Sequence, residues 1–489
     1  MLLDTLLAAN RESPDTLAVD DGRLELTYRR LTLLARVMAR LVRRETAVDR
    51  VGIMLPASAV FPASLFGVLW AGKIAVPLNF LLNPETVAGV VRDSGIDLIL
   101  TIRHFEEFAG GLPARLLFVD ELPLKRRVLM EMARSAPPVP DGGPHDTAVL
   151  LYTSGTTAEP KGVQLTHQNL QSNGADTIHS LKIPPSQRFL NFLPPFHVYG
   201  LTGNVIIPIM LKSTVYAMPR FSPISVVKKI AEKRISMMLA IPSMYAAILK
   251  TKSARREQFE SIDLAVSGGE PLSAKLRAGF EERFGVRLYE GYGLSETSPI
   301  IAASATEADR PGTVGKPIRN VEVKLVDDDG REIGQGADGE ILVRGPGVMK
   351  GYYNKPEETA AVLDADGWFK TGDIGRFDAD GYLSITGRAK EMLIIGGENV
   401  YPREIEAAIE QHEDVVQAAV IGVPDESRGE IPVAFVLRRD GAEVDGSEIR
   451  QFVKRLLAGF KVPKKVIIRD ELPTGPTGKI LKRKLHELL

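Results

Sequence analysis

The sequence predicts an α/β protein, with a large N-terminal domain of α/β-layered subdomains plus a small β-barrel, followed by an α+β C-terminal domain. Three observations predict this architecture. Helical and strand patterns alternate over about residues 1–300, short strands and turn dipeptides follow to residue 386, and a separate α+β pattern begins near residue 389. We therefore expect domains at 1–388, with a β-rich submodule at about 306–386, and at 389–489.

In the first 300 residues, helices are expected where apolar residues recur at helical spacing, and strands where short apolar runs end at turn residues. Residues 31–41 fit a helix, and residues 51–55 fit a strand that ends at Pro56. Strands separated by helices predict a mostly parallel sheet covered on both faces. The other strands are expected at 74–77, 97–101, 116–119, 148–151, 237–241 and 287–289, and the other helices at 63–71, 224–232 and 274–284.

The two later regions have their own patterns. Asp-Gly turns such as Asp329-Gly330 and Asp380-Gly381 separate short strands expected at 321–326, 340–343 and 382–385, which is typical of a small antiparallel β module. Beyond residue 389, Pro402 suits the first turn of a helix, and Ser447 is expected to cap a second one. Strands at 415–421 and 431–437 and a last helix at 480–488 complete this domain.

Composition limits the classes of partner. Among 489 residues, 61 are Lys or Arg and 62 are Asp or Glu, so the net charge of -1 gives no global attraction to nucleic acid or to an anionic membrane. There is no cysteine, which excludes disulfides and thiolate metal sites. The start has no basic and apolar leader, and the most apolar stretch, 63–82, is interrupted by Gly72 and Pro77. We expect a cytoplasmic protein with no membrane span and no nucleic-acid partner; the oligomeric state stays open, with a homodimer as one option.

A loop rich in hydroxyls follows the apolar run 148–151. It contains glycine, which lets backbone N–H groups approach an anion, hydroxyl donors and one lysine, and together these favour a polyphosphate site. It is not a Walker A loop, because GxxxxGK[ST] is absent. A flexible surface loop is the alternative on composition alone. The residues that would bind phosphate are Thr153, Ser154, Gly155, Thr156, Thr157 and Lys161.

Seven further blocks follow in order along the chain, and with this loop they resemble the adenylate-forming superfamily of acyl-CoA synthetases, amino-acid adenylation domains and beetle luciferases. The resemblance extends over nearly the whole chain, and it implies an enzyme that uses ATP and Mg²⁺ to make an acyl adenylate. The blocks are residues 195–200, 267–271, 290–297, 371–373, 387–390, 396–399 and 473–479.

The resemblance implies a role for each motif residue. Ser295 contacts phosphate, Glu296 holds Mg²⁺, and Tyr292 packs on the adenine. Asp373 accepts from the ribose hydroxyls and Arg388 contacts ribose or phosphate. Lys479 reaches the substrate carboxylate and the α-phosphate, while Lys161 neutralises the departing pyrophosphate. The remaining nucleotide-binding residues implied are Gly268, Gly269, Glu270, Pro271, Glu290, Gly291 and Gly293.

Two residues limit the choice of acid substrate and of thiol acceptor. His197 stands where amino-acid-activating relatives carry Asp, so an amino-acid substrate is disfavoured, and by resemblance His197 lines the channel where carboxylate and thiol meet. Gly397 would border the pantetheine tunnel of coenzyme A. The resemblance also implies that the C-terminal domain is mobile and rotates about a hinge at Lys390, so that Lys479 and Gly397 serve the two half-reactions in turn.

The resemblance therefore implies an AMP-forming acid–thiol ligase for a medium- to long-chain fatty acid, with coenzyme A as the acceptor. The resemblance implies acyl-pocket segments at 198–209, 240–244, 268–270 and 293–301. No Arg or Lys lies in them, which weighs against a dicarboxylic acid. Alternatives that stay open are loading of an acyl carrier protein, an aryl-acid CoA ligase, luciferase-like oxidation and a non-catalytic binder. By resemblance, Pro473, Gly478 and Lys479 also match a pattern that a lysine acetyltransferase modifies in some bacterial relatives.

Overall fold

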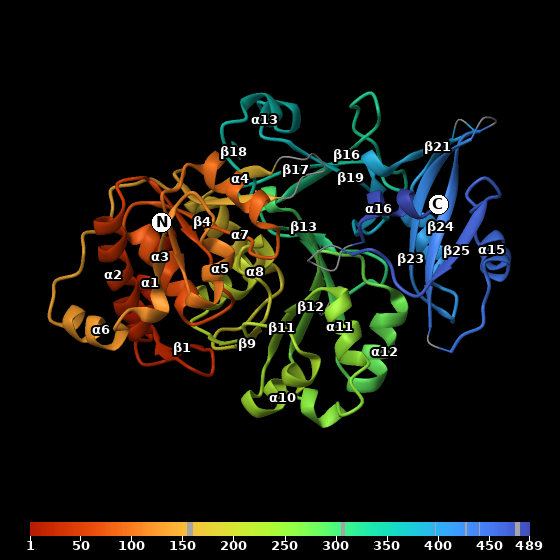
Figure 1. Cartoon of the computed structure of the whole chain (residues 1–489). Helices are drawn as coiled ribbons and strands as arrows, with labels where there is room; N and C mark the ends of the chain where they lie inside the picture. The colour runs from red at the N-terminus through yellow and green to blue at the C-terminus, as the bar shows by residue number, and fades with distance from the viewer. Residues whose placement is uncertain (154–159, 305–308, 397, 426–427, 440, 475–479) are drawn as a thin grey trace.

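The computed structural model describes residues 1–153, 160–304, 309–396, 398–425, 428–439, 441–474 and 480–489 (Figure 1). These residues form four β-sheets, two of them large and mixed. The strands of the first 300 residues are divided between the two large sheets instead of forming one, because apolar patterns identify strands but not their partners. No helix of the described ranges combines the length and the apolar character that crossing a bilayer requires.

The first large sheet has the strand order β18-β8-β7-β4-β3-β5-β6. Strands β3 to β7 run parallel, and β8 and β18 add an antiparallel edge. Helix α3 (Val60–Trp70), predicted at 63–71, is buried along nearly its whole length. It approaches α2 (Tyr28–Glu45) closely at Gly67, where a Cβ would lie 2.4 Å from the Cβ of Met38. The strands are β3 (Arg50–Ile53), β4 (Ile74–Pro77), β5 (Leu98–Thr101), β6 (Arg115–Phe118), β7 (Thr147–Thr153), β8 (Lys161–Thr166) and β18 (Gly351–Tyr352).

Helices α1 (Leu2–Glu12), α4 (Pro84–Ser94), α5 (Glu106–Ala109) and α6 (Leu124–Met132) complete this part of the chain. Helix α6 packs on α2 at the end of the molecule away from the C-terminal domain (Figure 1).

The second large sheet has the order β15-β14-β13-β12-β11-β9-β10-β1-β2 and is parallel from β13 to β1. Its strands are β1 (Leu17–Asp20), β2 (Glu25–Thr27), β9 (Arg188–Asn191), β10 (Thr214–Ala217), β11 (Met237–Ala240), β12 (Leu264–Gly268), β13 (Leu288–Gly293), β14 (Ile300–Ala303) and β15 (Lys316–Pro317). The helices between them are α7 (His167–Ser180), α8 (Val198–Leu201), α9 (Ile207–Met210), α10 (Pro223–Lys233), α11 (Pro242–Leu249) and α12 (Ala274–Phe284).

The β-rich submodule is a four-stranded antiparallel sheet in the order β16-β17-β19-β20. Among the described residues its pairing is linear, so it is an open sheet and not the closed barrel that the turns suggested. The elements are β16 (Glu322–Val326), β17 (Gly339–Arg344), β19 (Phe369–Phe377), β20 (Leu383–Arg388) and the small helix α13 (Pro356–Val362).

The C-terminal region has its own core around β23 and β24. Ser447 does not cap its helix; Asp445 does, because its carboxylate accepts from the backbone N–H groups of Ser447 (2.8 Å) and Glu448 (2.9 Å). The last helix begins later than predicted, since Ile480 bridges Thr474. The elements are β21 (Leu393–Ile395), β22 (Glu398–Val400), α14 (Pro402–Ile409), β23 (Val415–Asp425), β24 (Gly429–Arg438), α15 (Gly446–Lys454), β25 (Lys465–Arg469) and α16 (Lys482–Leu485).

Candidate active site

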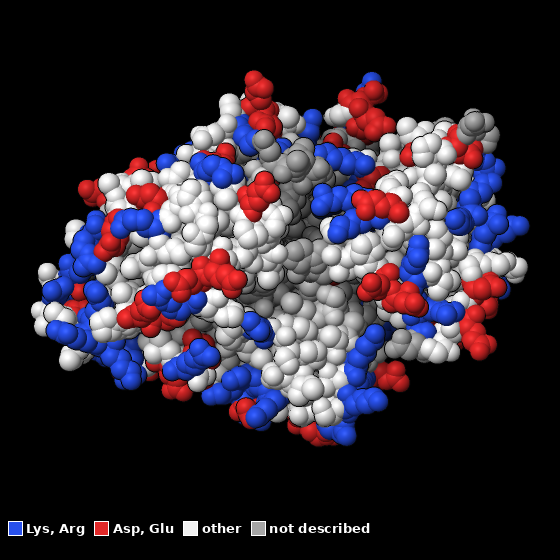
Figure 2. All heavy atoms as spheres, viewed as in Figure 1, with Lys and Arg blue, Asp and Glu red and all other residues white. Residues whose placement is uncertain are grey.

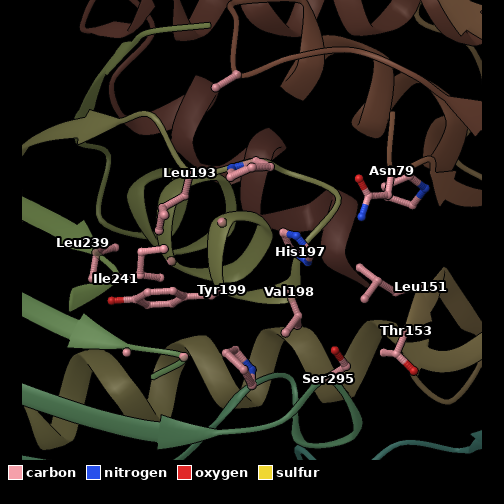
Figure 3. Close-up of a pocket in the computed structure, with 18 of the residues that line it drawn as sticks. Asn79, Leu151, Thr153, Leu193, His197, Val198, Tyr199, Leu239, Ile241 and Ser295 are labelled. Atoms are coloured by element: carbon pink, nitrogen blue, oxygen red, sulfur yellow. The ribbon is translucent and has the colours of Figure 1, made fainter. Parts of the chain in front are cut away.

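One cavity of about 2070 Å³ brings together most of the motif residues that the structure describes. It lies at the carboxyl ends of parallel strands, where Thr153 ends β7, Gly268 ends β12 and Gly293 ends β13, and ligands of open α/β sheets bind at such edges. Figure 3 shows His197 and Val198 between a hydroxyl-bearing end at Thr153 and Ser295 and a mostly apolar end at Leu193, Leu239 and Ile241.

The structure separates the predicted site residues into three groups. Lining the cavity are Thr153, Lys161, His197, Gly268, Gly269, Glu270, Gly291, Tyr292, Gly293, Ser295, Glu296, Arg388 and Lys390. Not lining it are Pro271, Glu290 and Asp373. Outside the described residues lie Ser154, Gly155, Thr156, Thr157, Gly397 and Lys479.

Glu296 lies in a tight turn (Ser295–Thr297) that follows β13. Its Oε1 accepts from the hydroxyl of Tyr352 at 2.8 Å, and Lys161 Nζ lies 5.0 Å from the centre of the same tyrosine ring. Burial raises the pKa of Glu296, whereas the Tyr352 hydrogen bond, Arg388 and Lys161 favour its charged form. This grouping sets a carboxylate, a hydroxyl and a cation at the hydroxyl-bearing end of the cavity.

A single carboxylate can still fit Mg²⁺. No cluster of three or more His, Asp or Glu side chains suited to a metal occurs within the part of the chain that the structure describes. Magnesium usually keeps several waters and takes only one or two protein carboxylates beside substrate phosphates. Glu296, which is partly accessible in the cavity, meets that requirement.

Asp373 is 3% exposed and lies behind two lining residues. Its Oδ2 accepts from the Tyr292 hydroxyl at 2.7 Å, and its Oδ1 pairs with Arg388 Nε at 2.8 Å. The register of β19 and β20 places Arg388 directly opposite Asp373. Burial is the main cause that raises the pKa of Tyr292, with the Asp373 charge second. Asp373 therefore orients Tyr292 and Arg388, which line the cavity. The sequence predicted a contact of Asp373 with the ribose and did not predict this role.

His197 precedes helix α8 and faces the cavity between its two ends (Figure 3). Its ring lies 4.8 Å from that of Phe196, edge to face. Next along the chain, Tyr199 donates to the backbone oxygen of Val266 at 3.0 Å, so its hydroxyl is held against β12 and its ring forms a wall of the cavity. A Cβ on Gly268 would lie 3.3 Å from that ring, which leaves little room for any other residue there.

Glu290 lies in β13 and does not line the cavity; its Oε1 accepts from the Leu272 backbone N–H at 3.2 Å. Burial raises the pKa of Glu290 to about 7. With this pKa, about half of the Glu290 carboxyls carry a proton at pH 7. This fits a structural role in β13, and the contact of Glu290 with the nucleotide stays a prediction.

Glu290→Gln should stabilise the protein at alkaline pH. The folded state keeps a proton on Glu290 up to pH about 7, while the unfolded state loses it near 4.5. Stability is therefore lost as pH rises from about 4.5 to 7, by about 3 kcal/mol at most. Glutamine keeps the carbonyl acceptor without the ionisation. Unfolding midpoints at pH 5 and pH 8 test this: the variant should exceed wild type at pH 8 only, and a variant that is less stable at pH 8 would contradict the assignment.

Tyr352 was not predicted as a site residue. It reaches the site because β18 pairs with β8, with Tyr352 opposite Val163, nearly two hundred residues away in sequence. Asn79 and Phe80, just beyond β4, also line the cavity without having been predicted. None of these residues lies in a recognisable sequence motif, so only the strand pairing and the loop positions identify them as site residues.

Comparisons with known proteins agree with this geometry. The family model of the AMP-binding enzyme matches residues 6–353, and that of the AMP-binding enzyme C-terminal domain matches residues 404–479. The chain is 37% identical to a feruloyl-CoA synthase of Amycolatopsis sp, with 96% of each chain covered. It is 36% identical to a long-chain-fatty-acid–CoA ligase of Bacillus subtilis, covering 90% of this chain and 85% of that one.

Solved structures give the same result. ATP-bound MatB from Rhodopseudomonas palustris matches at a TM-score of 0.91 and 30% identity, covering 100% of this chain and 98% of that one. The anthranilate CoA ligase AuaEII with anthranoyl-AMP matches at 0.91 and 28%, covering 100% and 96%. The o-succinylbenzoate CoA synthetase of Bacillus subtilis with ATP and magnesium matches at 0.86 and 29%, covering 99% of each chain.

The fold and the site thus define an enzyme of the acid–thiol ligase class, which activates an acyl or aryl acid as its adenylate and uses ATP with Mg²⁺ and coenzyme A as co-substrate. The chain belongs to the AMP-binding enzyme family. The predicted resemblance and the predicted α/β fold class are confirmed, apart from the barrel form of the β-rich submodule.

Proposed function

We propose that this enzyme activates a medium- to long-chain fatty acid to its acyl adenylate and transfers the acyl group to coenzyme A. The observation that carries the proposal is the apolar end of the cavity, which continues past Tyr199 toward the amino ends of β9, β11 and β12. The four residue steps along β12 from Gly268 to Leu264 span about 13 Å, which is the depth of this end of the cavity. The side chains at this end are Leu181, Ile183, Phe189, Ile207, Met237, Leu239 and Leu264.

Two polar groups near this end, Tyr199 and Thr177, already have partners. Tyr199 donates to Val266, and the Thr177 hydroxyl donates to the Asn173 backbone oxygen at 2.7 Å. An alkyl chain gains free energy from burial without needing a hydrogen bond, whereas a buried polar substituent needs one. A monocarboxylic acid with an extended hydrocarbon tail fits this lining better than an acid with polar substituents.

The residue roles follow from where the charge develops. The substrate carboxylate attacks the α-phosphate near His197, with Lys479 as the cation that lets the two anions approach. Lys161 stabilises the departing pyrophosphate, and Glu296 holds Mg²⁺, which when bound neutralises phosphate charge. Tyr292 and Arg388, oriented by Asp373, hold the adenosine part. In the second half-reaction the thiol attacks the acyl carbonyl and AMP leaves.

Coenzyme A would enter where exposed basic residues line the cavity. The exposed residues Arg23, His104 and Arg220 line the same cavity as the buried site residues, and the Arg220 guanidinium lies 3.2 Å from His104 Nε2. Basic side chains at a mouth attract a phosphorylated co-substrate. An acyl carrier protein is the alternative acceptor, and an acetyltransferase acting on Lys479 is a further proposed partner.

An aryl acid is the second candidate, because a feruloyl-CoA synthase is 37% identical over nearly the full chain. An aromatic acid would occupy the space beside Tyr199 and leave the deep end past Leu239 unused. The length dependence of the rate therefore separates the two candidates.

Gly203→Val should shorten the preferred acid. Gly203 lines the cavity, and a Cβ there would lie 2.9 Å from Leu239 Cδ1 and 3.8 Å from the Tyr199 ring. Each methylene that no longer fits should lower kcat/KM by about fourfold, the equivalent of about 0.8 kcal/mol. The measurement is kcat/KM over straight-chain acids for wild type, Gly203→Val and the control Gly89→Ala, whose new Cβ meets nothing within 4 Å. An unchanged chain-length profile in Gly203→Val would argue against a fatty-acid pocket.

A further inference from the structure

Exposed apolar side chains gather on one segment at the end of the molecule away from the C-terminal domain. Leu129 (67% exposed), Met130, Met132 (62%) and Val139 all lie within eleven residues, on α6 and the chain just after it. Scattered exposed apolar residues are normal, but a cluster marks an interaction site. We call residues 124–139 the α6 segment.

The outward face of α6 combines these apolar residues with cations. At 100° per residue, Lys125, Arg126, Leu129, Met130 and Met132 share one side, while Leu124, Val128 and Glu131 point to the opposite side. The α6 segment contains four basic residues and one acidic residue, Glu131, which is only 2% exposed. All residues of the helix are described, and its outward face carries no carboxylate.

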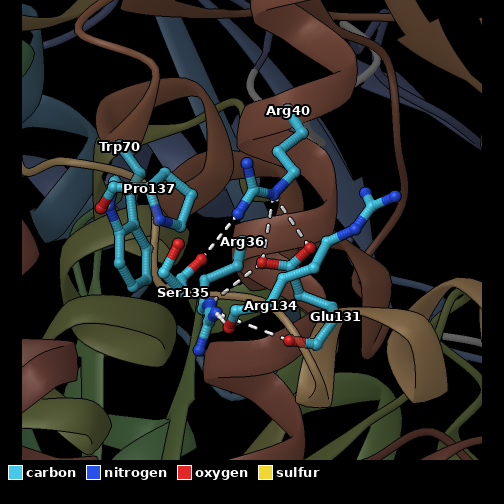
Figure 4. A network of polar contacts seen from close by, with 7 residues as sticks. All are labelled: Arg36, Arg40, Trp70, Glu131, Arg134, Ser135 and Pro137. Carbon is cyan, nitrogen blue, oxygen red and sulfur yellow. Dashed lines mark hydrogen bonds and ion pairs between the residues drawn. The ribbon is translucent and has the colours of Figure 1, made fainter.

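Polar contacts of Glu131 with helix α2 keep the opposite, basic and apolar face of α6 directed outward. Both Glu131 oxygens are bound, Oε1 at 3.1 Å from Arg36 Nε and Oε2 at 2.9 Å from Arg40 Nε (Figure 4). The same two arginines donate to backbone oxygens of Arg134 (2.7 Å) and Ser135 (2.6 Å).

The contacts continue beyond α6. The indole of Trp70 donates to the Pro137 oxygen at 3.1 Å, and Arg43 donates to the Pro138 oxygen at 3.2 Å (Figure 4 shows Trp70 and Pro137). Helices α2 and α3 therefore fix the α6 segment at several points, and its apolar residues are displayed on an ordered support.

We propose that the α6 segment docks the enzyme on an anionic lipid bilayer. A helix with basic and large apolar residues side by side lies in a membrane interface, with the apolar groups among the acyl chains and the cations at the headgroups. Figure 2 shows Lys and Arg gathered at the end of the molecule where Figure 1 places α6. The nearby carboxylates of Asp120 and Glu121 are engaged by Arg103 and lie before the helix.

The charges on α6 argue against a second copy of the chain as the partner of this face. In a two-fold dimer the same patch meets itself, which would set Lys125 and Arg126 of both copies against each other without a facing carboxylate on the helix. A bilayer at this end leaves the C-terminal domain at the other end of the molecule, away from the membrane plane (Figure 1). The proposal stands apart from the choice of acid.

Vesicle co-sedimentation of the full-length protein tests the proposal. Wild type should sediment with phosphatidylcholine vesicles that contain phosphatidylglycerol, and weakly with phosphatidylcholine alone. Removing both charges in Lys125→Gln/Arg126→Gln should weaken binding by about 25-fold, since each basic residue contributes about fivefold. Binding should also fall in 1 M NaCl, where the Debye length is about 3 Å.

Leu129→Glu should abolish sedimentation, whereas the matched control Ile224→Glu should bind like wild type, because Ile224 is equally exposed at 67% but lies on α10. Thermal unfolding should be unchanged in both variants because neither side chain is buried. Wild type that stays in the supernatant with anionic vesicles, or Leu129→Glu that binds like wild type, would overturn the proposal. A wild-type dimer that Leu129→Glu dissociates, without vesicle binding, would overturn it in favour of self-association.

Discussion

Glu296→Gln lowers acid-dependent ATP–pyrophosphate exchange by about 10²- to 10³-fold at saturating Mg²⁺, or about 2.7 to 4 kcal/mol. The reason is that Glu296 is the proposed protein ligand of Mg²⁺, and glutamine keeps its shape and its contact with Tyr352 while losing the charge. The measurement is isotope exchange into ATP with wild-type and variant enzyme at equal ATP.

Tyr352→Phe is the matched control for this variant. It removes the hydroxyl that donates to Glu296 but keeps the ring beside Lys161, so we expect a loss of no more than about tenfold, mainly in KM for MgATP. Exchange at the wild-type rate in Glu296→Gln would refute the metal assignment. Equal losses in both variants would show that the carboxylate acts only through its position.

Lys479→Ala should abolish adenylate formation, by about 10²- to 10³-fold or more, and still convert a supplied acyl adenylate to the thioester. Lys390→Pro and Gly397→Leu should do the reverse. The reason is that Lys479 and Gly397 are expected to reach a single cavity in two different poses of the C-terminal domain. Lys390 lies in the turn Ala389–Glu391, between β20 of the N-terminal domain and β21, and lines that cavity. Proline there fixes φ and hampers the rotation.

Single-turnover kinetics of each half-reaction distinguish these variants. Lys390→Ala is the control for Lys390→Pro, because it removes the charge and keeps the torsional freedom. If Lys390→Ala behaves like the proline variant, the charge and not the hinge is responsible. If Lys479→Ala slows both halves equally, the two-pose account is wrong for this protein.

Local sequence patterns predicted individual elements well. Helix α12 and strand β4 have the predicted bounds, since apolar spacing and turn residues are local properties. The division of strands between two sheets was not predicted, because pairing depends on contacts far apart in sequence. Asp445, not Ser447, caps α15 for a related reason: both residue types cap helices, and only the backbone conformation decides between them.

The same limit applies to the site. Glu296, Lys161 and Arg388 were found from motifs, whereas Tyr352 required the pairing of β18 with β8. The ribose contact assigned to Asp373 stays a prediction, and the structure adds that its carboxylate is bonded to both Tyr292 and Arg388. A motif identifies a residue type and a chemistry, and the strand register decides which atoms face the cavity.

The most direct test of the central claim is a panel of acids assayed for ATP consumption and for thioester formation with coenzyme A. The panel should include straight-chain acids of increasing length, ferulate, a dicarboxylic acid and an amino acid. We expect kcat/KM to rise by about fourfold per methylene until the pocket is full, with acyl-CoA as product. A preference for ferulate, for the dicarboxylic acid or for the amino acid, or adenylate that coenzyme A does not consume, would contradict it.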